Sequence, residues 1–195
     1  MGILVFAALV GLANCAGAAP EPPPSEPPAP TVSPSVSPSE DPEEPGEEAP
    51  FPEPLPLPDY PEDLTAEDTA ENAILAAEYF VDLMNYTQSS GDTGAFEEVV
   101  LEQCNTCERF VDLQADRADA GGYLQGNLIT VEDAQVKRTE SGQAWEVAST
   151  WQVSDGVKQD SANSAKMEVP GRTEEMRIAV ALINKKWALV EIAHG

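Results

Sequence analysis

Residues 145–153 of this chain read WEVASTWQV, and this stretch decides the fold class. Every second position carries a side chain suited to a core: Trp145, Val147, Ser149, Trp151 and Val153 alternate with Glu146, Ala148, Thr150 and Gln152. A period of two residues predicts a β-strand with one buried face. Such a strand belongs to an antiparallel sheet that covers a core on one side.

Three further segments have the composition of strands in the same sheet, namely 129–138, 176–183 and 187–193. The last two flank Asn184-Lys185-Lys186, which predicts a hairpin. The intervening residues 154–171 are expected to form a polar loop with room for one short strand at 167–169.

Upstream of these strands the period changes to that of helices. Thr65, with Asp68 three residues later, resembles a capping box and opens a helix predicted to run to about Thr87. Thr93 opens a short second helix, and Asn105 caps a third that ends before Gly121-Gly122. Three helices followed by a curved antiparallel sheet of about four strands predict an α+β domain over residues 65–195.

Residues 15–64 differ sharply in composition from the rest of the chain. Of 18 prolines, 17 lie between Pro20 and Pro61. Proline removes backbone donors and disfavours helix in the residue before it, so a disordered Pro/Glu-rich linker is expected. The linker can act as an extended spacer of roughly 3.1 Å per residue, or as a ligand for proline-reading modules. The side chains that could dock on the domain are Phe51, Leu55, Leu57 and Tyr60.

The first 14 residues are predicted to be a signal peptide. Ile3 to Ala13 is apolar throughout but shorter than the roughly 20 residues that span a bilayer. Leu12-Ala13-Asn14-Cys15 resembles a bacterial lipobox, although Asn14 is unusual there and no basic residue precedes the apolar run. An upstream start codon would explain the missing basic residue, and a plain cleaved signal is the alternative. From the lipobox resemblance we expect a lipid anchor at Cys15. Several acyl chains such as palmitate would then hold the protein at a membrane.

Charge excludes some partners. Residues 16–64 hold 12 acidic and no basic residues, while residues 65–195 hold 23 acidic and all ten basic residues, which leaves the domain near −13. Neutralising phosphates requires clustered Lys and Arg, so no nucleic-acid binding is expected. Attraction to anionic lipid by charge is not expected either.

Several motifs together resemble a known family: 78–80 (EYF), 83–86 (LMNY), 90–92 (SGD), 104–107 (CNTC) and 121–126 (GGYLQG). They are similar to actinobacterial lipoproteins of unknown function, the domain of unknown function numbered 6318, over about residues 70–195. The element order resembles the nuclear-transport-factor-2-like cone, also called the cystatin-like roll. The resemblance implies this fold and an extracytoplasmic location on the outer face of the cell membrane, but no activity.

Cys104 and Cys107 are the two cysteines that remain once Cys15 is lipidated. An even remainder in an exported protein predicts a disulfide, which would pin the turn between the second and third helices. The alternative is a redox dithiol at a helix N-terminus. No strand precedes this CxxC motif, so the surroundings of a thioredoxin are missing.

Five aromatic side chains are candidates to line a pocket in the cone: Tyr79, Tyr86, Trp145, Trp151 and Trp187. The alternative is that they form the core. Among the strand carboxylates, Glu191 shares a face with Trp187 and Leu189 by alternation and could point inward, as an enzyme on this fold would require. The alternative is a position on the surface or at the rim, and catalysis is not expected. No catalytic residue, metal-ligand set or cofactor motif is predicted.

The sequence thus predicts an exported lipoprotein, held by its lipid anchor at the membrane. Its domain is expected to act as a non-catalytic binding or interaction module for an envelope protein or a small apolar ligand. The alternative function is a small-molecule carrier, or an isomerase-like or cyclase-like enzyme that uses the cone cavity.

Overall fold

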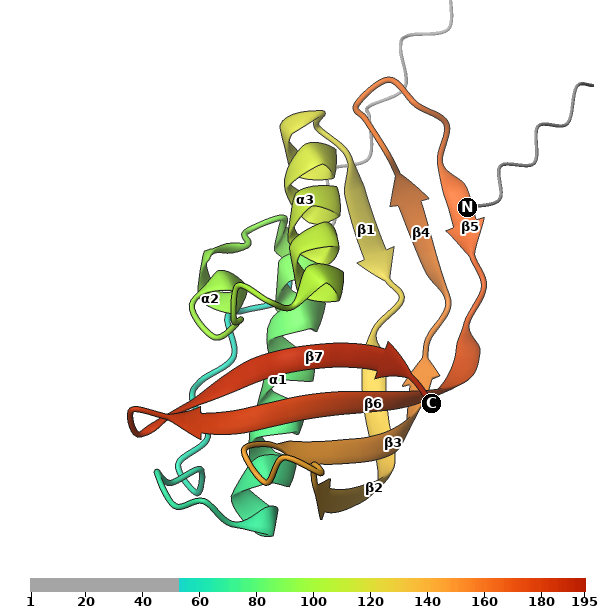
Figure 1. Cartoon of the computed structure of the whole chain (residues 1–195). Helices are drawn as coiled ribbons and strands as arrows, with labels where there is room; N and C mark the ends of the chain where they lie inside the picture. Colours follow the sequence, from blue (N-terminus) through green and yellow to red (C-terminus); the bar gives the residue numbers. More distant parts are fainter. Residues whose placement is uncertain (1–52) are drawn as a thin grey trace, which may run out of the picture. The chain divides into compact units, whose positions relative to one another are not determined.

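Three helices precede seven strands in residues 53–195, the part of the chain that this computed structural model describes (Figure 1). The predicted signal peptide, Cys15, and the linker as far as residue 52 lie outside the described residues.

Helix α1 (Ala70–Ser90) begins four residues later than the capping-box pattern predicts. Thr69 is the N-cap, and its side chain accepts a hydrogen bond from the Asn72 backbone N–H. Thr65 instead contacts Asn72, whose Nδ2 donates to Thr65 Oγ1 at 2.9 Å. The helix continues to Ser90, and Gly91 ends it with φ 75°, a left-handed conformation that favours glycine.

Two shorter helices follow, α2 (Gly94–Glu97) and α3 (Asn105–Asp119). Between them the chain pairs with the last strand, since the Leu101 N–H donates to Leu189 O at 2.9 Å and the Leu189 N–H donates to Val99 O at 2.7 Å. These bonds occupy backbone groups at an otherwise open sheet edge.

The strands form two sheets. A four-stranded antiparallel sheet has the order β2-β3-β6-β7, and a three-stranded one has the order β1-β4-β5. The bounds in chain order are β1 (Tyr123–Gly126), β2 (Ile129–Arg138), β3 (Trp145–Val153), β4 (Gly156–Gln159), β5 (Met167–Val169), β6 (Arg172–Ile183) and β7 (Lys186–His194). The sequence predicts β2 and β3 with these bounds, but it does not predict β1 or β4.

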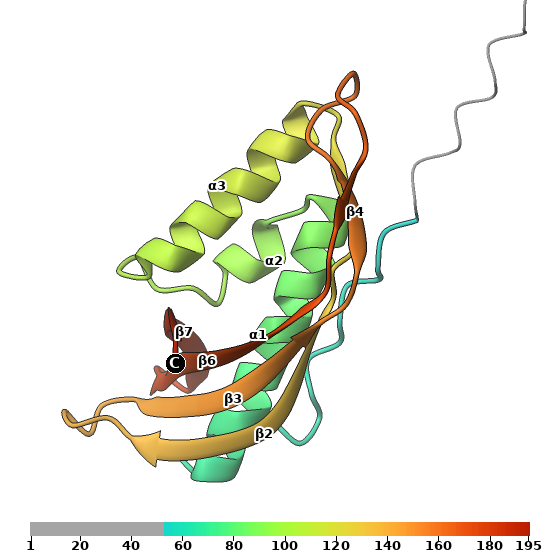
Figure 2. The ribbon, with the colours of Figure 1, turned by 90° about the vertical axis from the view of Figure 1, so that its right-hand side faces the viewer.

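The small sheet continues the large one. Only two residues separate β1 from β2, β3 from β4, and β5 from β6. The order β1-β4-β5 therefore repeats the order β2-β3-β6, as three long strands that bend together. Figure 2 shows β3 running on into β4 along one curved path. The expected short strand at 167–169 is confirmed as β5. The expected polar loop at 154–171 is wrong in part, because β4 extends β3 and pairs with β5.

The core lies between α1 and the inner face of the four-stranded sheet. Its largest fully buried side chains include Phe80, Leu83, Phe96, Ile178 and Leu189. Each contributes roughly 1.5–3 kcal/mol to stability relative to an exposed position. The amphipathic pattern of α1 and the alternation along β3 and β6 are confirmed by this packing.

Residues 53–64, which are predicted to be linker, lie against the domain. Leu64 is 5% exposed. The Tyr60 ring meets the Tyr79 ring edge-on with centroids 5.3 Å apart, and the Leu55 N–H donates to Ser89 Oγ at 3.0 Å. Leu57 stays exposed, and Phe51 lies outside the described residues. The predicted boundary between residues 64 and 65 therefore falls inside the described fold, because a few apolar side chains dock even where prolines prevent regular structure.

Candidate functional site

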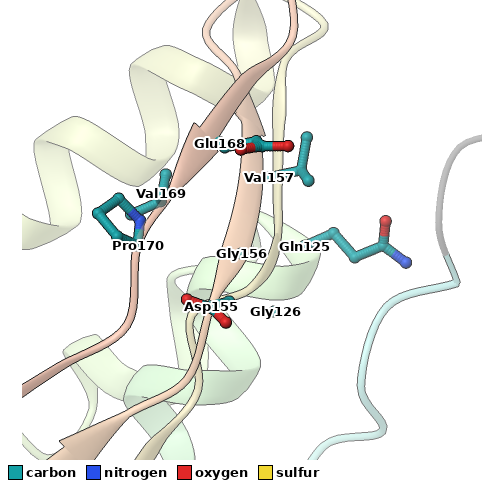
Figure 3. A pocket seen from close by; sticks show the side chains of 8 residues that line it. All are labelled: Gln125, Gly126, Asp155, Gly156, Val157, Glu168, Val169 and Pro170. Carbon is teal, nitrogen blue, oxygen red and sulfur yellow. The ribbon is translucent and has the colours of Figure 1, made fainter.

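A hollow of about 710 Å³ opens where the three long strands bend. Residues from β1, β4, β5 and the bends between strands line it: Gln125, Gly126, Asp155, Gly156, Val157, Glu168, Val169 and Pro170. Figure 3 shows these side chains around the three strands, with Gln125 and Glu168 extending to one side and Pro170 lying on the other.

Asp155 holds the bend together. Its backbone carbonyl accepts a hydrogen bond from the Asn127 N–H at 3.0 Å, and its Oδ1 accepts one from the Gly171 N–H at 2.7 Å. These two bonds connect the bends of all three long strands through one residue. Its carboxylate is therefore engaged in holding backbone.

Glycines occupy two positions of the bend where the strands lie very close together. Gly126 has φ 70°, and a Cβ on Gly156 would lie 2.8 Å from both the Asn127 N and the Gln125 O. No other residue fits these positions without moving the backbone. The glycines therefore allow the neighbouring strands to approach one another closely at the bend.

One face of the small sheet carries a short cross-strand row. Gln125 pairs with Val157, and Val157 pairs with Glu168, so their side chains point to the same face. The row offers an amide, an apolar side chain and a carboxylate. This set can hydrogen-bond and bury a ligand, but it contains no nucleophile paired with a base.

Residues 53–195 contain no group of three or more His, Cys, Asp or Glu side chains that could hold a metal ion. Within the same residues, no helix has the length and apolar character needed to cross a membrane.

The predicted disulfide is confirmed. Cys104 and Cys107 are bonded, and both are at most 2% exposed. Cys104 is also the N-cap of α3, since its Sγ accepts a hydrogen bond from the Cys107 N–H at 3.3 Å. The bond lies where the chain leaves the edge of β7 and enters α3. Cys15, the predicted lipid anchor, lies outside the described residues.

The two most buried of the predicted pocket residues belong to the core. Trp151 and Trp187 are each 4% exposed and pack within the core cluster. The Trp151 Nε1–H donates to Ser149 Oγ, and the Trp187 Nε1–H donates to Thr65 O at 2.9 Å. Both indoles therefore fill the space between helix and sheet, and neither lines the hollow.

The other three aromatic residues are half-buried and have separate partners. Tyr79 packs against Tyr60, and the Trp145 Nε1–H donates to Asp68 Oδ1 at 2.8 Å. The Tyr86 hydroxyl donates to Asp92 Oδ2 at 2.8 Å. The structure thus does not bring the five predicted aromatic side chains together around this hollow.

These contacts lower the pKa of two carboxyl groups. Hydrogen bonds from Arg138 and Trp145 lower the pKa of Asp68. The hydrogen bond from the Tyr86 hydroxyl lowers the pKa of Asp92 and raises the pKa of Tyr86. Both pairs lie at the surface and join neighbouring segments, and neither lines the hollow.

Glu191 lies on the surface, as one of its two predicted positions has it, and not on the inner face that strict alternation would give. The register of β7 against β6 shifts between Ala179 and Val180, so Ala179 pairs with Glu191 while Val180 pairs with Leu189. The extra residue, Val190, is a β-bulge that reverses the facing of the residues after it. Ile192 becomes buried and Glu191 becomes exposed.

A sequence signal for the bend exists in retrospect. Each long strand is interrupted by a turn-forming dipeptide: Gly126-Asn127, Asp155-Gly156 and Pro170-Gly171. One such pair alone indicates a loop. Three pairs flanked by strand-like residues indicate that a sheet changes direction at a common line.

Comparison with known proteins gives a family and a fold. The model of DUF6318, described as a family of unknown function, matches residues 44–193. No curated protein matches the chain.

Solved structures resemble the fold at low identity. The intermembrane-space region of the chloroplast protein ARC6 is 16% identical with a TM-score of 0.49, over 66% of this chain and 97% of that one. Aln2 from a Streptomyces species is 15% identical with a TM-score of 0.42, over 64% and 90%. A NTF-2 like protein of unknown function from Shewanella oneidensis is 14% identical with a TM-score of 0.34, over 61% and 92%. The chain has a mixed α+β fold with nuclear-transport-factor-2-like structural neighbours.

Proposed function

The chain belongs to DUF6318, a family of unknown function, and we propose that it is an exported, membrane-tethered lipoprotein whose folded domain is a non-catalytic binding module. The observation that carries the binding role is the hollow at the bend of the three long strands, described above. The export and the lipid anchor rest on the apolar N-terminal run, Cys15 and the Pro/Glu-rich segment.

The hollow suits an extended polypeptide segment. β5 is the last strand of its sheet, so its outer edge has no strand partner within residues 53–195. An unpaired edge can accept a further strand through main-chain hydrogen bonds, while side-chain contacts beside it give specificity. Val157, which pairs with Glu168 of β5, offers the apolar contact.

Charge favours a partner segment that contains Lys or Arg. Asp155 and Glu168 are the ionisable residues that line the hollow, and both are acidic. The domain as a whole is near −13. Complementary charge accelerates encounter and selects against acidic partners. An envelope protein with an exposed basic, extended segment is the proposed partner.

The carrier and enzyme alternatives lose support from the packing of the interior. Both require an open cavity inside the cone, and a carboxylate held within it in the case of an isomerase. Trp151 and Trp187 are packed in that interior, and Glu191 faces outward.

Site-specific photo-cross-linking in the native envelope tests the binding role. A photoreactive residue replaces Val157 in the hollow, and a matched variant carries it at Ile183, an exposed apolar residue beside the β6–β7 turn. We expect a defined protein adduct from position 157 that Glu168→Lys weakens, and none from position 183. Equal adducts from both positions, or none from either, would refute the binding site.

The anchor is tested separately. Cys15→Ser should release the protein from the membrane into the medium, measured by fractionation of the cells. Unchanged retention in the membrane fraction would contradict lipidation and would leave the hollow as a property of the domain alone.

A further inference from the structure

A second cavity, of about 200 Å³, lies where the ends of α1 and α3 meet the start of β1. Pro54 contributes one part of its wall, and polar side chains contribute most of the rest, among them Gln88, Ser89, Gln114 and Arg117. It shares no lining residue with the hollow at the bend. A ligand here would therefore be independent of the proposed partner.

Arg117 is a buried cation with an unused donor. Its side chain is 9% exposed, and its Nη1 donates to Gln114 Oε1 at 2.6 Å. Its Nε has no hydrogen-bond partner in the structure. This Nε forms an ion pair with Asp160, whose Oδ1 lies 3.6 Å away, beyond hydrogen-bond range, on a side chain that is 48% exposed. A buried donor left without a partner costs free energy that a ligand could recover.

Arg117 shares its carboxylate partner with a second cation. Asp160 also pairs with Lys158, whose Nζ lies 3.2 Å from Oδ2. A carboxylate placed at Arg117 would give this cation a partner of its own.

The helix ends limit how much negative charge the cavity can take. The last turns of α1 and α3 contribute to the wall, and helix C-termini carry a partial negative charge. Some of their carbonyls already accept bonds, such as Arg117 O from the Gly122 N–H at 2.8 Å. The remaining field favours a singly charged group over a phosphate dianion.

We infer that this cavity binds a carboxylate group, with Arg117 as the principal donor and Gln114 positioning it. The planar guanidinium fork matches the two oxygens of a carboxylate better than a point charge does. The carboxylate can come from a free small acid or from the chain's own linker. The linker is a chemically suitable source because residues 16–64 carry 12 acidic residues, and Pro54 already borders the cavity.

Titration of the full-length protein with sodium acetate tests this inference. The ionic strength is held constant with chloride, and the Arg Nε–H signals are followed by NMR. We expect a saturable downfield shift for Arg117. Arg109 is the matched control, since it lies on α3 but its Nε donates to Asn105 O on the protein surface. An Arg117 shift that does not saturate, or that equals the Arg109 shift, marks non-specific ion effects and overturns the inference.

Three variants identify the role of each group. Arg117→Lys keeps the charge but loses the fork. Because this variant has no Arg117 Nε–H signal, the titration is followed at the side-chain N–H signals of Gln114, where the saturable shift of the wild type should disappear. If that variant does not fold, Gln114→Glu serves instead, because the new carboxylate competes for Arg117 and should weaken acetate binding at least about tenfold. A linker variant with Glu47→Gln, Glu48→Gln and Glu53→Gln distinguishes the two sources.

A stronger acetate response in the linker variant assigns the carboxylate to the chain itself. The same saturable response in the wild type and the linker variant assigns it to a free acid. The absence of a saturable response in both proteins overturns the site.

Discussion

The two sheets of this domain share the same three long strands, yet their side chains differ in burial. Below the bend, β2, β3 and β6 lie on α1, and alternate residues such as Val147, Trp151 and Ile178 are almost fully buried. Above the bend, β1, β4 and β5 contain a single buried residue, Leu124. One continuous sheet can therefore stabilise the fold at one end and leave most of its side chains accessible at the other.

The bend itself needs only a few residues. Asp155 joins the three strands, and the glycines allow the backbones to approach. Because the side chains at this point are small or engaged, the strands can change direction without forming a second core. Four predictions test how far the two ends of the sheet differ.

The largest effect is expected from truncation in the core. Trp151→Ala should lower the free energy of unfolding by about 3–5 kcal/mol, because it leaves a cavity between α1 and β3. Val157→Ala in the small sheet should change it by about 0.5 kcal/mol or less, since this side chain is only half buried. Urea denaturation measures both. Equal losses would show that the small sheet has a core of its own.

A smaller loss is expected where α1 holds the connection between the sheets. Asn85 Nδ2 donates to Ile129 O at 2.9 Å, and the Ile129 N–H donates to Asn85 Oδ1 at 2.8 Å. Asn85→Ala leaves both backbone groups without partners, so we expect a loss of about 2–3 kcal/mol by urea denaturation. Asn163→Ala, in an exposed loop, is the control. A loss no greater than that of the control would show that the helix does not hold the connection.

The disulfide should contribute about 2 kcal/mol, as expected for a very short loop. The double variant Cys104→Ser/Cys107→Ser tests this by denaturation with and without reductant. Reduced wild type should match the variant, whose stability should not depend on reductant. Loss of the bond should also loosen the pairing of Val99–Leu101 with β7, visible as faster amide exchange at Leu189. Unchanged stability and amide exchange would show that the disulfide does not stabilise the turn.

The smallest effect concerns pH. Arg138 and Trp145 lower the pKa of Asp68 in the folded state. The stability from these contacts is therefore complete above the unfolded pKa of about 3.9, and it is lost as the pH falls through the lowered folded pKa. Asp68→Asn should flatten this part of the acid stability curve, and Trp145→Phe should flatten it less. Asp68 is exposed, so the change is modest. A curve identical to that of the wild type would contradict the assignment.

Local patterns in the sequence predict the elements whose side chains repeat regularly. The strands 129–138 and 145–153 appear with the predicted bounds, and the hairpin turns at Asn184 and Lys185, whose positive φ values suit a two-residue turn. The cysteine pair is also predicted, since pairing follows from number and spacing. In each case the controlling interaction is between residues close in the chain or repeated along it.

The candidate sites depend on contacts between distant residues, and the sequence does not reveal these. One extra residue at Val190 turns Glu191 from the inner to the outer face, and alternation alone does not locate a bulge. Arg117 is buried because α1, β1 and residue 54 converge around it. From the sequence, an isolated Arg near the end of an amphipathic helix is predicted to be exposed.

The sequence by itself determined the α+β order, the core face of α1, the main strands and the cysteine pair, because these follow from periodicity and local chemistry. The tertiary structure alone decided that three strands bend together around Asp155, that Trp151 and Trp187 fill the interior, and that residues 53–64 belong to the fold. Bends, bulges and buried charges depend on packing between segments that are far apart in the sequence. No single segment of the chain therefore contains enough information to predict them.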